Sequence, residues 1–289
     1  DVQVARAGFE AAREAGFTLF DHADIYKRGR AEEVFGRVLA EHPSWRSSIV
    51  IQSKCGIRFA DPRSAYPVKH YDASKATIMD CVEQSLRRLR TSYLDILLLH
   101  RPDVLMEPEE VAAAADELQK AGKVRHFGIS NAAPSQIDLL NRHLREPLRV
   151  HQIELSLLHH RLIDESVLVN HGTVAPTHTG LLDHARSNGM VIQAWSPLAG
   201  GRLLRSTHGE TDPKIHRLVE CVQRMADEWH VSREAIMLAW LLRIPGLVQP
   251  IIGSTQPDRI RAAAQADRVH LSREAWYTLW VAARGEELP

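Results

Sequence analysis

Four residues whose side chains can move a proton stand at or near the points where predicted strands end. Asp21, Lys54 and His100 each follow a short apolar run, and Tyr26 lies five residues after Asp21 in the segment DHADIY. A phenol is a poor acid near neutrality, with an unperturbed pKa of about 10, and a nearby ammonium group favours the phenolate. A carboxylate beside that ammonium would keep it charged and in place. A carboxylate, a phenol, an amine and an imidazole around one cavity form a set suited to proton transfer.

Each of these residues also has a plainer interpretation. Asp21 can cap a turn, Lys54 can be solvated, Tyr26 can pack within a loop, and His100 can cap its strand. Each plain role is a good explanation when its residue is considered alone. The four plain roles together are much less convincing, because the residues follow three separate strands and other predicted strands also end in polar residues. Those further strand-end residues are Ser130, Asn131, Gln152, Trp195, Ser196, Gly253 and Ser254.

The strand that ends in His100 is the clearest element of the sequence. Its residues from Tyr93 to Leu99 form a nearly unbroken apolar run, which is typical of a parallel strand buried on both faces. Strands that alternate with helices predict a parallel sheet, and one uninterrupted series of this length favours a (β/α)8 TIM barrel. In such a barrel the carboxyl ends of the strands form a single mouth. The other predicted strands, each followed by a helix, are 17–20, 49–53, 125–129, 149–155, 191–195 and 248–252.

This series contains seven strands, and an open sheet of seven would leave two exposed edges, which proteins avoid. We therefore expect the first barrel strand and an N-terminal hairpin to precede the helix that begins near residue 2, outside the sequence. No linker, charge block or repeat divides residues 1–289, so a single barrel domain is expected. The segment 157–177 and the loop containing Pro62 and Pro67 are expected to be irregular.

Composition excludes several classes of protein. The 289 residues are 44% hydrophobic and 25% charged, with zero formal net charge, so nothing indicates a nucleic-acid or membrane partner. No apolar run reaches the length of a transmembrane helix. Three scattered cysteines favour a reducing cytoplasm over a disulfide-bonded secreted protein. The sixteen histidines include no HExxH motif or Cys/His spacing, so no metal site is predicted and a metal-dependent barrel hydrolase is disfavoured.

Seven segments occur in the order and at the spacings of one known family: DHADIY, QSKCG, LLLHRPD, GKVRHFGISN, HQIE, AWSPLAGGRL and PIIGS. Over essentially its whole length the chain resembles the aldo-keto reductase superfamily, and within it a bacterial branch of broadly described oxidoreductases. The resemblance implies a catalytic tetrad of Asp21, Tyr26, Lys54 and His100. Tyr26 would protonate the carbonyl oxygen while a nicotinamide delivers hydride to carbon. His100 would orient the carbonyl and share in proton delivery.

The resemblance also implies a cofactor site. An arginine and two hydroxyls at a helix N-terminus suit a phosphate, so NADPH is expected. NADH is the alternative, because Gly253 stands where many relatives carry a lysine. The implied contacts are Ser130, Asn131, Gln152 and Trp195 for the nicotinamide; Ser196, Leu198, Gly200, Gly201 and the adjoining Arg202 for the pyrophosphate; and Gly253, Ser254, Thr255 and Arg259 for the adenosine 2′-phosphate.

The expected function is therefore that of a cytoplasmic NADPH-dependent reductase of aldehydes or ketones, acting in reverse on the CH–OH group of donors. Its partner would be a small-molecule carbonyl substrate, with no nucleic acid or membrane involved, and a monomer is the default for the superfamily. The alternative is a non-catalytic NADP(H)-binding regulatory subunit on the same fold. Retention of Tyr26 together with Lys54 favours the enzyme, because a pure binding module does not need both.

Overall fold

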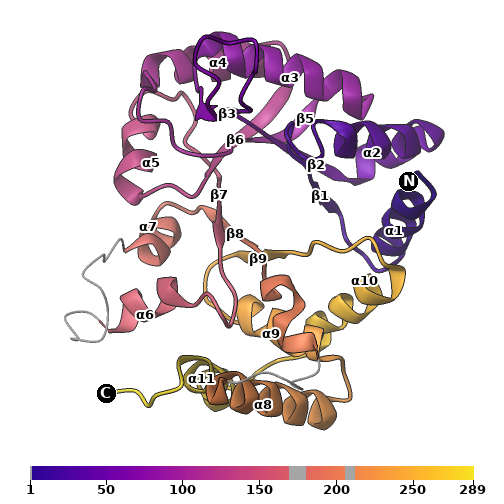
Figure 1. Ribbon diagram of the computed structural model, residues 1–289, viewed down its shortest axis with the longest axis vertical. Helices are drawn as coiled ribbons and strands as arrows, with labels where there is room; N and C mark the ends of the chain where they lie inside the picture. Colours follow the sequence, from indigo (N-terminus) through magenta and orange to yellow (C-terminus); the bar gives the residue numbers. More distant parts are fainter. Residues whose placement is uncertain (1, 169–179, 206–211) are drawn as a thin grey trace. The chain divides into compact units, whose positions relative to one another are not determined.

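The computed structural model describes residues 2–168, 180–205 and 212–289. By its internal contacts the chain divides into two compact units (Figure 1). The first unit comprises Asp1–Glu10 and Phe17–Gln152, and the second comprises Ala11–Gly16 and Ile153–Pro289. The strand-end residues predicted to carry proton transfer all lie in the first unit.

The first unit is built on a parallel sheet with the strand order β1-β2-β5-β6-β7. The central strands β2 and β5 are buried along almost their whole length, as their apolar sequences predict. An antiparallel hairpin, β3 with β4, follows β2. The strands are β1 (Leu19–Asp21), β2 (Val50–Cys55), β3 (Ile57–Arg58), β4 (His70–Tyr71), β5 (Leu94–Leu99), β6 (Val124–Ser130) and β7 (Val150–Glu154).

Helices follow the strands of this unit, and α2, α3 and α4 lie along the same side of its sheet (Figure 1). Helix α3 begins at a serine cap, where the Ser74 hydroxyl accepts a hydrogen bond from the Thr77 amide at 3.3 Å. Helices α2 and α3 approach closely at Gly36, where a Cβ atom would lie 2.2 Å from the Arg88 carbonyl oxygen. The helices are α1 (Val2–Glu14), α2 (Arg30–Glu41), the 3₁₀ turn η1 (Pro43–Ser48), α3 (Lys75–Leu89), α4 (Pro108–Lys120) and α5 (Pro134–Asn141).

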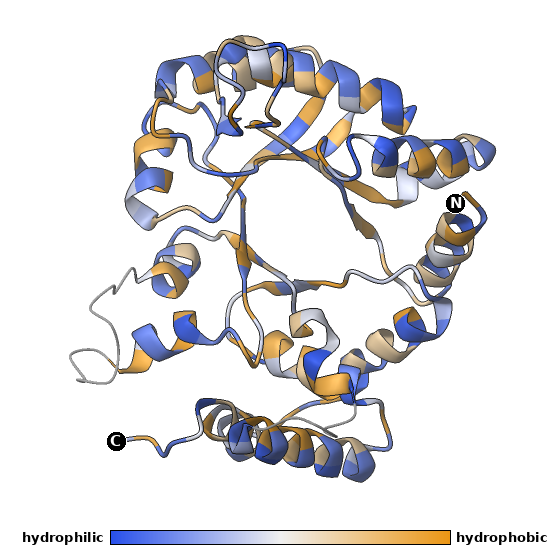
Figure 2. Cartoon of the chain, in the orientation of Figure 1, coloured by the Kyte–Doolittle hydropathy of each residue, from blue (hydrophilic) through white to orange (hydrophobic). Residues whose placement is uncertain are grey.

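The second unit contains the parallel pair β8 and β9, packed with helices. Helix α9 is its most apolar element, with every residue from 235 to 241 buried, whereas most helices carry hydrophilic and hydrophobic stripes (Figure 2). Among the described residues no helix is long and apolar enough to cross a membrane. The elements are α6 (Arg161–Val167), α7 (Leu181–Ser187), β8 (Val191–Trp195), η2 (Ala199–Leu204), α8 (Pro213–Trp229), α9 (Arg233–Leu242), β9 (Val248–Ile251), α10 (Pro257–Ala264), η3 (Gln265–Arg268) and α11 (Arg273–Arg284).

Two local predictions were wrong, and one feature was missed. The loop containing Pro62 and Pro67 is irregular over 59–69, as expected, but the strands β3 and β4 that flank it were not predicted, because two residues are too few to leave a periodic pattern. The segment 157–177 contains the seven-residue helix α6, although residues 169–177 lie outside the described part. Lys54 lies within β2 and not beyond its end, because pairing with β5 continues to Cys55.

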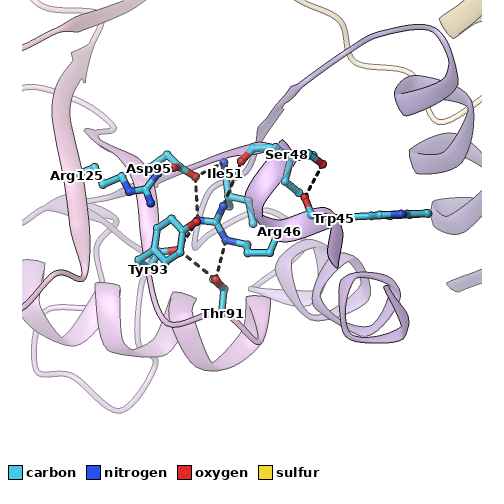
Figure 3. A network of polar contacts seen from close by, with 9 residues as sticks. Trp45, Arg46, Ser48, Ile51, Thr91, Tyr93, Asp95 and Arg125 are labelled. Carbon is cyan, nitrogen blue, oxygen red and sulfur yellow. Dashed lines mark hydrogen bonds and ion pairs between the residues drawn. The ribbon is translucent and has the colours of Figure 1, made fainter. Parts of the chain in front are cut away.

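A buried carboxylate holds the amino-terminal ends of β2, β5 and β6 together (Figure 3). Asp95 accepts hydrogen bonds from the Ile51 amide at 2.9 Å and from Arg125 at 2.8 Å, and it forms an ion pair with Arg46 at 2.8 Å. The two guanidinium groups also approach the Tyr93 ring, with their central carbons 3.6 and 4.1 Å from its centroid. This network lies at the end of the strands opposite to Lys54 and His100, so it is placed to support stability and not chemistry.

We predict that Asp95→Asn lowers the free energy of unfolding by about 2–3 kcal/mol, because removing one partner of a buried ion pair leaves the other uncompensated. Urea unfolding followed by circular dichroism measures the change. Asp116→Asn is the matched control, since Asp116 forms an exposed pair with Lys120, and such pairs contribute about 0–1 kcal/mol. Equal losses in the two variants would show that the Asp95 network does not have this role.

Candidate functional site

The ammonium group of Lys54 is the centre of the candidate site. The Lys54 side chain has no solvent exposure. Its Nζ donates to Asp21 Oδ2 at 2.6 Å, to the His22 carbonyl oxygen at 2.8 Å and to the Tyr26 hydroxyl at 3.2 Å. An ammonium has three donors, and here each has an acceptor. This matters because a buried charge is tolerated only when it is paired and hydrogen-bonded.

Asp21 is held on its other side by Gln52, whose side-chain amide donates to Asp21 Oδ1 at 2.5 Å. The two residues are partners in the register of β1 and β2. The sequence-based prediction missed Gln52, although a signal was present. Gln52 precedes Lys54 by two positions, so both side chains point to the same face of the strand. Asp21 is thereby fixed by one neutral and one charged donor.

The opposite face of β2 is anchored by Ser53. Its hydroxyl donates to Glu32 Oε1 at 2.6 Å, and the fully buried Glu32 also accepts from Arg88 at 2.7 Å. Glu32 lies on α2 and Arg88 on α3, so this chain of contacts ties the Lys54 strand to two helices. The position of Lys54 is therefore restrained from both faces of β2.

Tyr26 projects from a turn with an uncommon backbone. The residue is 38% exposed, and its hydroxyl accepts a hydrogen bond from Lys54. The next three residues, Lys27, Arg28 and Gly29, all have left-handed φ values of 50°, 56° and 85°. For the two non-glycine residues this conformation costs roughly 1–2 kcal/mol each. The surrounding structure must supply that energy, as is common near functional sites.

His100 directly follows β5, and its amide donates to the Cys55 carbonyl oxygen at 2.9 Å. Its ring approaches the Tyr26 ring edge-on, with the centroids 5.9 Å apart. Burial lowers the pKa of His100 to about 3, and the positive charge of Lys54 acts in the same direction. The imidazole is thus neutral near pH 7 and can orient a polar group through one N–H.

Three residues predicted to bind nicotinamide meet at the ends of β6 and β7. Ser130 and Gln152 are register partners and are buried. The Asn131 amide donates to the Gln152 carbonyl oxygen at 2.9 Å, and its side chain donates to the Ser130 hydroxyl at 2.6 Å. The structure therefore brings this amide- and hydroxyl-bearing group together in the first unit, toward the carboxyl-terminal side of the sheet, where Lys54 and His100 also lie.

In the second unit, the residues predicted to bind pyrophosphate form a loop after β8, which ends in the half-buried Trp195. Ser196, Ala199, Gly200 and Gly201 all have left-handed φ values between 47° and 76°. The Ala199 and Gly201 amides donate to the carbonyl oxygens of Ser196 and Leu198, both at 2.8 Å, so the loop is a compact turn held by its own backbone. Arg233 fixes the loop by donating to the carbonyl oxygens of Leu203 at 3.2 Å and Leu204 at 2.8 Å.

A cavity of about 420 Å³ borders the loop, lined in part by Ser196, Ala199, Gly200, Arg202 and Lys214. Leu198 lies within the loop and is half-buried.

The predicted 2′-phosphate residues lie at the start of α10. Gly253 and Thr255 are exposed, and the Ser254 hydroxyl accepts from the Gln256 amide at 3.1 Å. Arg259 is exposed in the first turn of the helix. Two hydroxyls and a guanidinium therefore sit at a helix N-terminus within the second unit. Over residues 2–168, 180–205 and 212–289, no group of three or more His, Cys, Asp or Glu side chains is placed to hold a metal ion.

Comparison with known proteins decides the family. The family model described as "Aldo/keto reductase family" matches residues 2–280. The chain belongs to the aldo/keto reductase family. Two bacterial relatives are the uncharacterized oxidoreductase YcsN of Bacillus subtilis, 38% identical over 95% of this chain and 86% of its own, and the oxidoreductase YdhF of Escherichia coli, 37% identical over 96% and 86%. A 6-dehydroglucose reductase of Agrobacterium fabrum is 37% identical over 98% of this chain and 89% of its own.

A solved structure supports the fold of this aldo/keto reductase. The crystal structure of the thermostable aldo-keto reductase Tm1743 with the inhibitor epalrestat matches with a TM-score of 0.73 at 24% identity, over 97% of this chain and 86% of that one. The predicted (β/α)8 barrel class is confirmed by this match and by the family. The single-domain organisation over 1–289 stays a prediction.

The neutral His100 of this aldo/keto reductase leads to a pH prediction. An unfolded histidine binds a proton below about pH 6.5, whereas folded His100 binds one only near pH 3. Its contribution to stability is thus fully present above pH 6.5 and is lost as the pH falls toward 3. His22, with a pKa lowered to about 4 by burial, acts in the same direction, and Asp24, with a pKa raised to about 6 by burial, opposes them.

We expect the wild-type free energy of unfolding to fall between pH 6.5 and 4.5, and His100→Gln to reduce that slope by about one proton, or about 1.4 kcal/mol per pH unit. Urea unfolding at several pH values measures both slopes. His126→Gln, which removes an exposed histidine of β6, is the control and should leave the slope unchanged. A His100→Gln slope equal to that of wild type would contradict the buried, neutral state of His100.

Proposed function

We propose that the protein is an NADPH-dependent reductase that converts aldehydes or ketones to alcohols, and in reverse acts on the CH–OH group of donors. The observation that carries the proposal is the contact of 3.2 Å between Lys54 Nζ and the Tyr26 hydroxyl, with Asp21 at 2.6 Å from the same nitrogen. Membership of the aldo/keto reductase family supports an oxidoreductase acting on small carbonyl compounds. The three free cysteines fit the cytoplasmic location that we propose with it.

In each unit taken separately, the residues predicted to contact the cofactor have the chemical groups that NADPH requires. In the first unit, Ser130, Asn131 and Gln152 offer donors and acceptors for a carboxamide. In the second, Trp195 would stack on the ring, and Gly200 and Gly201 have open space where a Cβ would stand, so a phosphate can approach the backbone there, although the Gly201 N–H already donates to the Leu198 carbonyl oxygen at 2.8 Å. Ser196, Leu198 and Arg202 would complete the pyrophosphate contacts, and Gly253, Ser254, Thr255 and Arg259 those of the 2′-phosphate. When bound, the reduced nicotinamide supplies the hydride.

The roles of the chain's own residues follow from their contacts. The Tyr26 hydroxyl would give its proton to the carbonyl oxygen. Lys54 would stabilise the phenolate that remains, because its ammonium already donates to that oxygen. Asp21 would keep Lys54 oriented. His100, with its pKa lowered to about 3, would hold the carbonyl oxygen through a neutral N–H, which leaves proton delivery to Tyr26.

We expect Tyr26→Phe to lower kcat for aldehyde reduction by about 10²–10⁴-fold, the usual contribution of a general acid, while NADPH still binds. The loss of NADPH absorbance at 340 nm with a panel of aldehydes, ketones and dehydro-sugars measures turnover. Tyr277→Phe on α11 is the matched control and should retain wild-type kcat. Full activity in Tyr26→Phe would overturn the proposed role. Tight NADPH binding by wild type with no turnover of any carbonyl would favour the regulatory binding subunit.

We expect Arg259→Gln to reduce kcat/KM for NADPH by roughly 10- to 100-fold and to leave the value for NADH nearly unchanged. A hydrogen bond to a charged group is worth about 1.5–3 kcal/mol, and only NADPH carries the 2′-phosphate. Steady-state kinetics with each cofactor measures the ratio. Arg261→Gln is the control on the same helix, because Arg261 instead pairs with Asp258 and Glu14. Parallel losses with both cofactors would remove Arg259 from phosphate recognition.

A further inference from the structure

Three segments that flank Tyr26 and His100 are joined by direct contacts. They are the turn 26–30, the hairpin segment 57–72 and the loop 101–106. The Asp72 amide donates to the Gly56 carbonyl oxygen at 2.9 Å, and the Ala73 amide donates to Asp103 Oδ2 at 3.1 Å. The central guanidinium carbon of Arg28 lies 5.0 Å from the Phe59 ring centroid. The segments therefore form one continuous rim beyond the carboxyl ends of β1, β2 and β5.

This rim carries positive charge that the protein does not neutralise. We define the cationic rim as Lys27, Arg28, Lys69 and Arg101. Within the described residues, none of the four has an ion-pair partner.

The carboxylates of the same three segments interact with donors close to them in the sequence or in the neighbouring segment. Asp61 pairs with Arg63, and Asp103 accepts from the amides of Ala73 and Leu105. Asp72 accepts from the Ser74 amide. The three segments together contain seven lysines and arginines and three aspartates, so their net charge is positive.

Two of these cations lie close to His100. Arg101 follows it in the chain, and Lys69 directly precedes β4 of the hairpin. Both charges contribute to lowering the pKa of His100, which requires them to lie near the imidazole. The other two, Lys27 and Arg28, follow Tyr26 in the left-handed conformation that costs roughly 1–2 kcal/mol per residue. Both side chains are exposed, so their charges are accessible beside Tyr26.

The same segments also expose large apolar side chains. Single exposed apolar residues are ordinary on a protein surface, but a group of them on the segments around one site is a mark of binding. The group comprises Phe59, Tyr66, Val68, Tyr71, Val104 and Leu105, which are between 42% and 94% exposed.

We propose that the preferred substrate is a carbonyl compound with an apolar or aromatic body and a carboxylate remote from the carbonyl, and that Lys69 and Arg101 bind that carboxylate. This inference rests on the proposed function. A carbonyl held at Tyr26 and His100 would place the far end of a short substrate toward the rim. There a guanidinium and an ammonium can both donate to a carboxylate.

The test uses two substrates that differ in charge and by one methyl group: 4-carboxybenzaldehyde and its neutral methyl ester, methyl 4-formylbenzoate. For wild type at low salt we expect kcat/KM to favour the acid by about tenfold, because two cations attract one carboxylate. Lys69→Gln and Arg101→Gln should each reduce this acid-to-ester ratio about threefold or more, chiefly by raising KM for the acid. Raising NaCl from 20 to 500 mM should lower the ratio in wild type, since exposed charges are screened.

Lys120→Gln, an exposed lysine of α4 paired with Asp116, is the matched control and should leave the ratio unchanged. A wild-type ratio near one, with the ester turned over, would overturn the carboxylate inference alone. Equal losses for both substrates in the rim variants, with weaker NADPH binding by fluorescence titration, would assign the cations to the cofactor and also overturn it. No turnover of either aldehyde by wild type would count against the proposed function, and the inference would fall with it.

Discussion

The arrangement around the candidate site depends on burying one ammonium group. Lys54 has no exposure, so its charge survives only because its three donors meet a carboxylate, a backbone carbonyl and a phenol. That requirement sets the register of β1 on β2, because Asp21 must stand opposite Gln52 to receive both amide and ammonium. It also sets the turn after β1, since the His22 carbonyl and the Tyr26 hydroxyl must reach the same nitrogen. The left-handed backbone of the residues that follow Tyr26 is one energetic cost of this turn.

The parallel strands of the first unit have different roles at their two ends. Strand β5 shows the contrast most clearly: Asp95 near its start gathers two arginines and an amide, and His100 just after its end faces Tyr26. Both ends contain buried charged groups, but these groups differ in whether their partners all come from the protein. At Asp95 every strong interaction is satisfied within the protein, so the network stabilises and rigidifies. Beyond the other end, Tyr26 and the cationic rim remain accessible, so their interactions stay available to a ligand.

The sequence predicted the barrel class and the residues that meet at Lys54, because alternating strands and helices leave strong periodic signals and polar residues at strand ends stand out against them. It failed where such signals do not exist. The β3–β4 hairpin has two residues per strand, and α6 has only seven residues, which is too few for a helical period to stand out in the longer segment around it. Gln52 lies inside β2, so only the alternation of side chains along the strand, and not its end, indicates that it shares a face with Lys54. The cationic rim could not be predicted at all, since its members come from three loops whose proximity depends on tertiary contacts such as that of Ala73 with Asp103.

The electrostatics of the first unit connect the proton donor with the rim. Asp21 balances the charge of Lys54, so the pair carries no net charge, and the ammonium acts on Tyr26 through its direct hydrogen bond. The remaining positive charge comes from Arg101 and Lys69, which act on His100 together with Lys54 and help keep it neutral. A neutral imidazole among cations can orient a carbonyl oxygen but gives up a proton poorly, which agrees with the acid role proposed for the phenol. The same cations would favour negative charge as it develops on that oxygen, so substrate selection and stabilisation of the reacting group would draw on one set of residues.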